Sequence, residues 1–142
     1  MSDLKAKILD IIGKPVLGAL ATITEEGKPW TRYVVPTADQ DLTIRFCTNV
    51  HSRKVANMRR NPEVHLTAGA NTLDNMGQPY LQIAGRAEIS VDPAVKRQFW
   101  HEELKAYFSG PEDPNYCVVV IRPYRIEYQT FESMAPQVWR AA

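Results

Sequence analysis

Phe46-Cys47-Thr48-Asn49-Val50-His51-Ser52-Arg53-Lys54 is the most informative stretch of the sequence, because a strand runs out into a turn there and a helix begins. Before and into this stretch, apolar and polar residues alternate from Leu42 to Cys47, with the period of two that is typical of a half-buried strand. Ser52 is a residue type that caps helices, and Asn61-Pro62 ends the helix predicted over residues 52–60. The sequence therefore predicts strand, turn and helix in this order.

The start of this predicted helix carries a hydroxyl and two cations. A helix N-terminus presents unbonded backbone N–H groups and the positive end of the helix dipole, so it favours an anion. Ser52 can donate to a phosphate oxygen, Arg53 can bind two oxygens at once, and Lys54 adds a compact charge. An ordinary capped helix with two solvated basic residues explains the same pattern. Cations at this end oppose the dipole unless an anion binds between them, however, which favours an anion site.

Outward from this stretch, the hydrophobic patterns predict a mostly β chain with short helices. A helix is expected over residues 4–12, and another begins at Asp92-Pro93 and continues through Leu104. The expected strands cover residues 16–23, 30–35, 42–47, 64–68, 80–91, 117–121 and 125–131. A bend or bulge is expected at Gly85, a turn at residues 38–41, and no regular element in residues 132–142. About seven strands in antiparallel hairpins suggest a barrel or a sandwich.

The size and charge of the chain limit what it can be. With 142 residues, it is expected to form a single domain over residues 1–142. Its 17 Lys and Arg residues against 16 Asp and Glu residues give a net charge of +1, so no nucleic acid or anionic membrane is expected as a partner. The basic residues of helix 52–60 form too small a cluster to change this. No apolar run approaches the roughly 20 residues of a membrane span, and no signal peptide pattern is found, so a soluble cytoplasmic protein is expected.

The cysteines and histidines indicate no further chemistry. Cys47 and Cys117 lie in apolar strand-like runs and are interpreted as buried free thiols. No pair among His51, His65 and His101 has the ligand spacing of a metal site, so no metal is expected.

A second candidate for the anion site lies upstream, in Thr31-Arg32-Tyr33-Val34-Val35-Pro36. Arg32 interrupts an otherwise apolar, strand-forming run. An arginine in a strand often just faces water, and that interpretation stays open beside a role in the site.

Several short segments together resemble the pyridoxamine 5′-phosphate oxidase family in the same order and close to the same spacing. These segments are Arg32-Tyr33-Val34-Val35, Phe46-Cys47-Thr48-Asn49, Ser52-Arg53-Lys54, Asn61-Pro62 and Gly85-Arg86-Ala87-Glu88. The likeness runs from about Val16 to Phe131. Within the superfamily, the short chain and the stretch Tyr107-Phe108-Ser109-Gly110-Pro111 are most similar to the general stress protein branch of the FMN-binding split barrels.

The resemblance implies a fold, a cofactor and an assembly. The fold would be an FMN-binding split barrel of six to seven antiparallel strands with short helices, forming a homodimer with one FMN in each of two interface grooves. By the family pattern, the phosphate would be held by Arg32, Ser52, Arg53 and Lys54. The ribityl chain and ring would be lined, through side chain or backbone, by Tyr33, Val34, Cys47 and Thr48. The partner chain would supply the remaining ring contacts.

Two departures from the family narrow the expected function. The chain ends at Val138-Trp139-Arg140-Ala141-Ala142 without the arginine-bearing C-terminal arm that holds pyridoxal substrates, so oxidation of pyridoxamine phosphate is not expected. Gln129 stands where related proteins often carry a tryptophan near the flavin. The expected function is therefore a flavin-dependent oxidoreductase acting on an unknown small substrate, with no evident catalytic acid or base. The alternatives are a non-catalytic flavin-binding general stress protein, a split barrel that uses F420 or heme, and a barrel without any cofactor.

Overall fold

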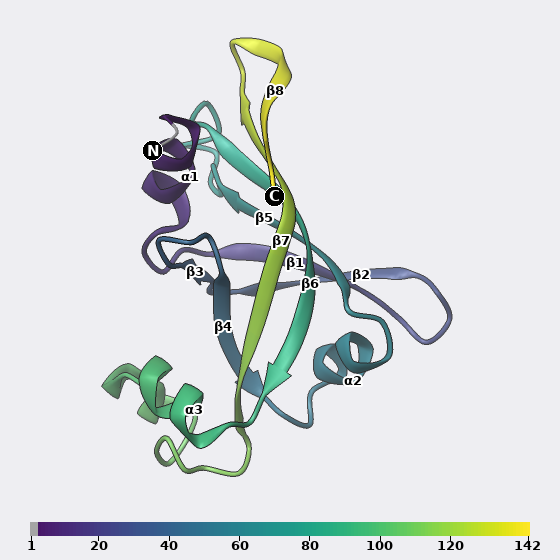
Figure 1. Ribbon diagram of the computed structural model, residues 1–142, viewed down its shortest axis with the longest axis vertical. Helices are drawn as coiled ribbons and strands as arrows, with labels where there is room; N and C mark the ends of the chain where they lie inside the picture. Colours follow the sequence, from purple (N-terminus) through teal and green to yellow (C-terminus); the bar gives the residue numbers. More distant parts are fainter. Residues whose placement is uncertain (1–2) are drawn as a thin grey trace.

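The computed structural model describes residues 3–142 and has a twisted antiparallel sheet with short helices around it (Figure 1). The strands are β1 (Gly18–Ile23), β2 (Pro29–Val34), β3 (Thr37–Ala38), β4 (Ile44–Asn49), β5 (Glu63–Gly69), β6 (Tyr80–Ser90), β7 (Tyr116–Thr130) and β8 (Ser133–Arg140). The helices are α1 (Asp3–Ile12), α2 (Arg53–Arg60), α3 (Pro93–Phe99) and the 3₁₀ helix η1 (Glu102–Ala106). None of the described helices is long and apolar enough to cross a membrane.

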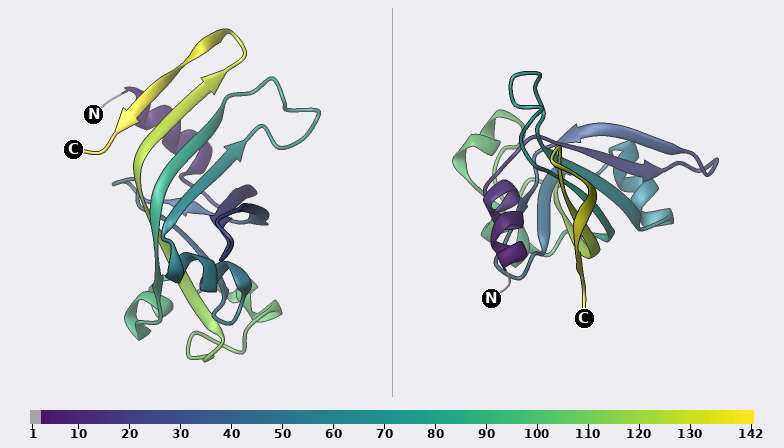
Figure 2. Two further views of the ribbon diagram at one scale, coloured as in Figure 1. Left: turned by 90° about the vertical axis from the view of Figure 1, so that its right-hand side faces the viewer. Right: turned by 90° about the horizontal axis from the view of Figure 1, so that it is seen from above.

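The sheet curls round because one bent segment joins its two ends. The strand order is β2-β1-β5-β6-β7-β4-β3, so β2 and β3 lie at opposite ends of the sheet. Along the chain, only Val35-Pro36 separates them, and the carbonyl of Pro36 accepts from the Val16 N–H at 3.1 Å. Counted as one bent strand, β2 and β3 correspond to the single strand predicted over residues 30–35. Figure 2 shows the curl from two further sides.

The longest strand, β7, replaces two predicted strands. Residues 117–121 and 125–131 belong to one strand of 15 residues that continues through Pro123, so the predicted break is wrong. Pro123 is tolerated because β7 is bulged there: Gly85 pairs with Pro123 and Ala84 with Arg125, so Tyr124 has no partner on β6, and this irregularity lies opposite the glycine where a bend or bulge was predicted. A Cβ on Gly85 would lie 2.9 Å from the carbonyl oxygen of Arg122, so only glycine fits the close approach of the two strands.

The C-terminal residues also form a strand that was not predicted. β8 pairs with the second half of β7, on the edge that β4 occupies along the first half. Most β8 residues are exposed or only half-buried, so the sequence lacks the apolar alternation from which a strand is predicted. Its backbone ladder to β7 holds it in place.

Two apolar clusters lie on opposite sides of β7. The barrel interior holds the larger one, which α1 covers with the fully buried Ile8 and Ile12. The smaller cluster lies under α3 and η1 and consists of Leu104, Phe108, Tyr116, Val118 and Val120. Because side chains alternate along a strand, Val119 and Ile121 face the interior while Val118 and Val120 face α3.

Two predicted boundaries move for local reasons. The helix expected from Asp92-Pro93 through Leu104 stops at Phe99, since Trp100 is extended, and η1 follows it. The strand expected from Leu42 begins only at Ile44, because Leu42 has a positive φ of 67° within the turn. The turn predicted at residues 38–41 is there, although Ala38 also ends the short β3.

Candidate functional site

The start of α2 carries a buried hydroxyl with no hydrogen-bond partner. Ser52 occupies the N-cap position in an extended conformation, as the sequence predicts, but its side chain makes no capping bond. Its Oγ is buried and has no partner among the described residues. A buried polar atom left in this way costs about 1–3 kcal/mol. In addition, the first backbone bond of the helix runs from Ala56 N to the Ser52 carbonyl, so the N–H groups of residues 53–55 point outward without helical acceptors.

Lys54 lies two residues after Ser52 on α2, and its side chain is hydrogen-bonded to β4. Its Nζ donates to Thr48 Oγ1 at 3.0 Å. Partial burial lowers the pKa of Lys54 below its usual value of 10.5, and the neighbouring Arg32 guanidinium lowers it further. A lysine whose charged form is disfavoured in this way gains from any anion that binds next to it.

Arg32 of β2 lies near Lys54 and lowers its pKa. Its Cα lies opposite that of Leu20 in the β1–β2 ladder. Its Nη1 atom donates to Thr22 Oγ1 at 2.7 Å, to the Trp30 carbonyl at 2.9 Å and to the Leu20 carbonyl at 3.3 Å. Among the described residues, Nη2 and Nε of Arg32 make no hydrogen bond, so this edge of the guanidinium stays available. Burial lowers the pKa of Arg32, and the nearby Arg53 adds to the effect.

Three cations therefore lie together without a counter-charge, and we call Arg32, Arg53 and Lys54 the cationic cluster. Within residues 3–142, no Asp or Glu side chain lies within 4.0 Å of any of the three. Their mutual repulsion contributes to the lowered pKa values of Arg32 and Lys54. Like charges held this close disfavour the ligand-free state, which is the arrangement expected of a site for a multiply charged anion.

The structure brings together five of the eight residues predicted for the site: Arg32, Thr48, Ser52, Arg53 and Lys54. The side chains of the other three point elsewhere. Val34 packs in the barrel core, and Cys47 packs against the cluster under α3, on the opposite face of β4 from Thr48. Tyr33 alternates with Arg32, lies on the outer face of β2 and is 74% exposed.

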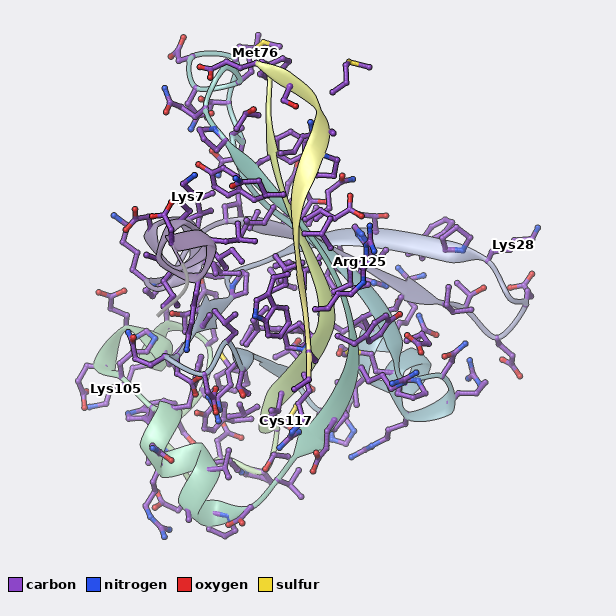
Figure 3. The ribbon with its side chains drawn as sticks, turned by 45° about the horizontal axis from the view of Figure 1, so that its top comes forward. Lys7, Lys28, Met76, Lys105, Cys117 and Arg125 are labelled. Carbon is purple, nitrogen blue, oxygen red and sulfur yellow. The ribbon has the colours of Figure 1, made fainter. Side chains whose placement is uncertain are left out.

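The two cysteines are free thiols, as predicted. They lie on opposite faces of the sheet, because Cys47 pairs with Val118 in the ladder whereas Cys117 pairs with Thr48. Burial raises the pKa of Cys47 to about 11. Cys117 is fully buried on the side of Thr48, and its Sγ donates to the Thr48 carbonyl at 3.4 Å. Figure 3 shows Cys117 toward the lower end of β7 in that view.

Sequence reasoning missed two polar residues behind Arg32. Thr22 on β1 is fully buried, and its Oγ1 accepts from Arg32 and, at 3.2 Å, from Asn57 Nδ2 on α2. The sequence signal that could have indicated Thr22 was a single hydroxyl residue at an inward-facing position of the otherwise apolar strand β1.

Among its described residues, the structure has hollows but no group of metal ligands. Within residues 3–142, no three His, Cys, Asp or Glu side chains are grouped as metal ligands. One hollow of about 470 Å³ is lined by residues of α1, β7 and β8, among them Lys7 and Tyr128. Another of about 100 Å³ lies over β5, β6 and β7 and includes His65 and Arg125. Neither hollow includes a residue of the cationic cluster.

The pyridoxamine 5′-phosphate oxidase family matches residues 4–130, which is most of the chain. The chain belongs to this family. General stress protein 26 of Bacillus subtilis is 32% identical over 134 residues, which are 94% of each chain. The crystal structure of General Stress Protein 26 from Bacillus anthracis is 31% identical, covers 99% of this chain and all of that one, and superposes with a TM-score of 0.82. The predicted split-barrel fold is thus confirmed.

More distant members differ in length and in the cofactors that their names state. The pyridoxine/pyridoxamine 5′-phosphate oxidase of Aeromonas hydrophila is 27% identical over 109 residues, 77% of this chain but 44% of that enzyme. An F420 reductase structure is 26% identical over 83% of this chain and 94% of that one, with a TM-score of 0.64. A heme binding protein from Mycobacterium smegmatis and an FMN binding protein from Nostoc punctiforme are 19% and 16% identical, with TM-scores of 0.69 and 0.61, and share the fold. The family fold therefore accommodates FMN-binding, F420 and heme-binding proteins.

Proposed function

We propose that this protein is a flavoprotein that binds FMN in a homodimer and acts as an oxidoreductase on a small substrate. The observation that carries the proposal is the buried, unbonded Oγ of Ser52 beside the cationic cluster. A phosphate monoester brings three acceptor oxygens and a charge near −2. It would satisfy this hydroxyl, the outward N–H groups of the α2 start and the available edge of Arg32 at once.

The proposed roles of the predicted residues follow from where their side chains point. Arg32, Ser52, Arg53 and Lys54 would hold the phosphate, and Thr48, which already bonds Lys54, would lie next to it. Val34 and Cys47 would contribute through their backbones, because their side chains are packed elsewhere. Bound FMN supplies the electron transfer, while the protein binds and orients it and excludes water from it.

The charge of the site favours FMN over the other cofactors of the family. A terminal phosphate monoester carries almost two charges, whereas the phosphodiester of F420 and each carboxylate of heme carry one. The three cations and one buried hydroxyl, with no carboxylate of residues 3–142 within 4.0 Å of the cations, match the more highly charged group. Mass spectrometry of the ligand released from the purified protein decides among the three, and we expect FMN.

The homodimer is proposed because the cationic cluster is not enclosed within a single chain: Arg53 is exposed, and Arg32 and Lys54 are only half-buried. The cluster adjoins neither hollow, and the neighbouring outer face of β2 exposes Tyr33 and Val35, which are 74% and 56% accessible. A second copy would cover this face and the flavin ring. Light scattering with and without FMN measures the mass of the particle, and a monomer in both samples would contradict the dimer.

A direct test of the cofactor is the visible absorption of the purified protein, followed by titration of any colourless fraction with FMN. We expect binding at micromolar FMN or below, and its absence would refute the proposal. The double variant Arg53→Ala/Lys54→Ala should lose most of this affinity without lowering the melting temperature of the flavin-free protein, since it removes repelling charges. The matched control is Arg59→Ala/Arg60→Ala, which removes the same charge from the exposed end of the same helix and should bind FMN normally.

A second candidate function is flavin binding without turnover, because none of the side chains described at the site stands out as a catalytic acid or base. Steady-state oxidation of NADH or NADPH with an electron acceptor separates the two, because a pure binding protein shows no rate above that of free FMN. Oxidation of pyridoxamine phosphate is not proposed, because this chain spans only 44% and 41% of the two oxidases that it matches.

A further inference from the structure

Thr22 is a fully buried hydroxyl that joins three elements of the site. Its Oγ1 accepts from Arg32 Nη1 of β2 at 2.7 Å and from Asn57 Nδ2 of α2 at 3.2 Å, while Thr22 itself belongs to β1. A hydroxyl oxygen has two lone pairs, so both are occupied by these donors. The Thr22 side chain therefore links Arg32 of β2 to Asn57 in the middle of α2.

These hydrogen bonds determine which edge of the Arg32 guanidinium remains available. Nη1 is used by Thr22 and by the carbonyls of Leu20 and Trp30, whereas Nη2 and Nε make no bond within residues 3–142. The shortest of the three bonds is the one to Thr22. The guanidinium is thus anchored at one corner with its opposite edge left for a ligand, which is the arrangement that binds two phosphate oxygens side by side.

The same bond opposes the repulsion within the cationic cluster. Within residues 3–142 no carboxylate pairs with Arg32, so its bonds to Thr22 and to the two carbonyls, of which the Thr22 bond is the shortest, are what hold it near Arg53 and Lys54. A site that is already assembled before the ligand arrives does not spend binding energy on ordering its side chains.

We propose that Thr22 is a positioning residue of the phosphate site, which fixes Arg32 for the ligand through its hydroxyl without touching the ligand. This inference rests on the proposed function insofar as the ligand phosphate is that of FMN. It assigns a role in affinity to a buried β1 residue that carries no charge.

The test is a double-mutant cycle between Thr22→Val and Arg32→Ala, with dissociation constants for FMN and for riboflavin, which lacks the phosphate. We expect Thr22→Val to weaken FMN binding by about 10-fold or more, the equivalent of one hydrogen bond to a charged group. Riboflavin affinity should not change, Thr22→Ser should restore FMN affinity, and Thr22→Val should cause no further loss in the Arg32→Ala background. If Thr22→Val does not fold, Thr22→Cys replaces it, because a thiol of similar size accepts weakly.

Two further results separate failure of this inference from failure of the proposed function. If the unmodified protein binds no FMN, the proposed function is wrong, and ¹⁵N NMR of the ligand-free protein still tests Thr22. We expect slow rotation of the Arg32 guanidinium that becomes fast in Thr22→Val. The inference is overturned if Thr22→Val binds FMN normally or if it loses affinity for FMN and riboflavin equally. It is also overturned if the loss of affinity caused by Thr22→Val adds in full to that of Arg32→Ala, or if Thr22→Val leaves the rotation of the Arg32 guanidinium unchanged.

Discussion

Replacing Ser52 by alanine separates the two roles that a serine at this position can have. An N-cap serine normally stabilises its helix, and its replacement by alanine costs about 1 kcal/mol. Ser52 makes no capping bond, and its Oγ is buried without a partner, so the alanine variant removes a desolvated atom instead of a bond. We therefore expect the free energy of unfolding of the flavin-free protein to stay the same or to rise by up to about 1 kcal/mol.

The same change should weaken FMN binding. A hydrogen bond from a hydroxyl to a charged phosphate oxygen contributes about 1.5–3 kcal/mol, which corresponds to a roughly 10- to 100-fold increase in the dissociation constant. Flavin fluorescence titration measures the affinity, and thermal unfolding of the flavin-free protein measures stability, where 1 kcal/mol shifts the melting temperature by about 4 °C.

The matched control is α3, whose N-cap side chain does make a capping bond. Asp92 does cap α3, since its Oδ1 accepts from the Ala94 N–H at 2.9 Å. Asp92→Ala should lower the melting temperature by about 4 °C and leave FMN affinity unchanged. If Ser52→Ala behaves like Asp92→Ala, with lower stability and normal affinity, then Ser52 is an ordinary cap and the reasoning from its buried hydroxyl is refuted.

Three other changes test the surroundings of the site. Burial and Arg32 lower the pKa of Lys54 below 10.5, and the lysine loses its charge as pH rises through this lowered pKa. FMN affinity, measured by fluorescence titration at a series of pH values, should therefore fall over that range. Lys54→Arg should flatten the fall, because arginine keeps its charge. Gly85→Ala should destabilise the protein by about 2–3 kcal/mol in urea unfolding, because the new Cβ would lie 2.9 Å from backbone and side-chain atoms of β7. An unchanged urea midpoint would contradict the close approach of β6 and β7 at this glycine. Tyr116→Phe removes a 2.8 Å hydrogen bond to the Lys96 carbonyl and should lower the free energy of unfolding by about 1 kcal/mol. FMN affinity should not change, since this ring packs under α3. A large loss of affinity would show that the two faces of β7 are coupled.

The sequence predicted the parts of the fold that have local signals. The helix at residues 52–60, the bulge at Gly85 and the alternating strands depend on turn residues and on periodic burial, and they are found close to where they were expected. The sequence predicted two strands, 117–121 and 125–131, where the structure has one, because the bulge that lets β7 continue past Pro123 depends on its pairing with β6. β8 has no apolar periodicity, and Met134, for example, is 98% exposed. The strand forms because it pairs with β7, and the local sequence of β8 does not indicate this pairing.

The site was predictable in its charges but not in its details. Arg32 and the Ser52-Arg53-Lys54 segment are visible as residues that break local rules, and the fold does bring them together. Whether the hydroxyl of Ser52 turns toward its own helix or away from it depends on side-chain rotation, which sequence does not encode locally. The anchoring of Arg32 by Thr22 joins β1 and β2 across a ladder and requires the register of the two strands.

The central place of β7 has a consequence for the order in which the protein can form. β4 and β6 both pair with β7, yet they precede it in the chain by the whole segment that contains α3 and η1. A nascent chain that has not yet been synthesised past Tyr116 holds the β1–β2–β5–β6 hairpins, while the edges of β4 and β6 that later receive β7 remain open. Such edges recruit other strands. Chains interrupted before residue 116 should therefore aggregate or be degraded instead of persisting as half-barrels, and completion of the segment from Tyr116 onward is what closes the barrel.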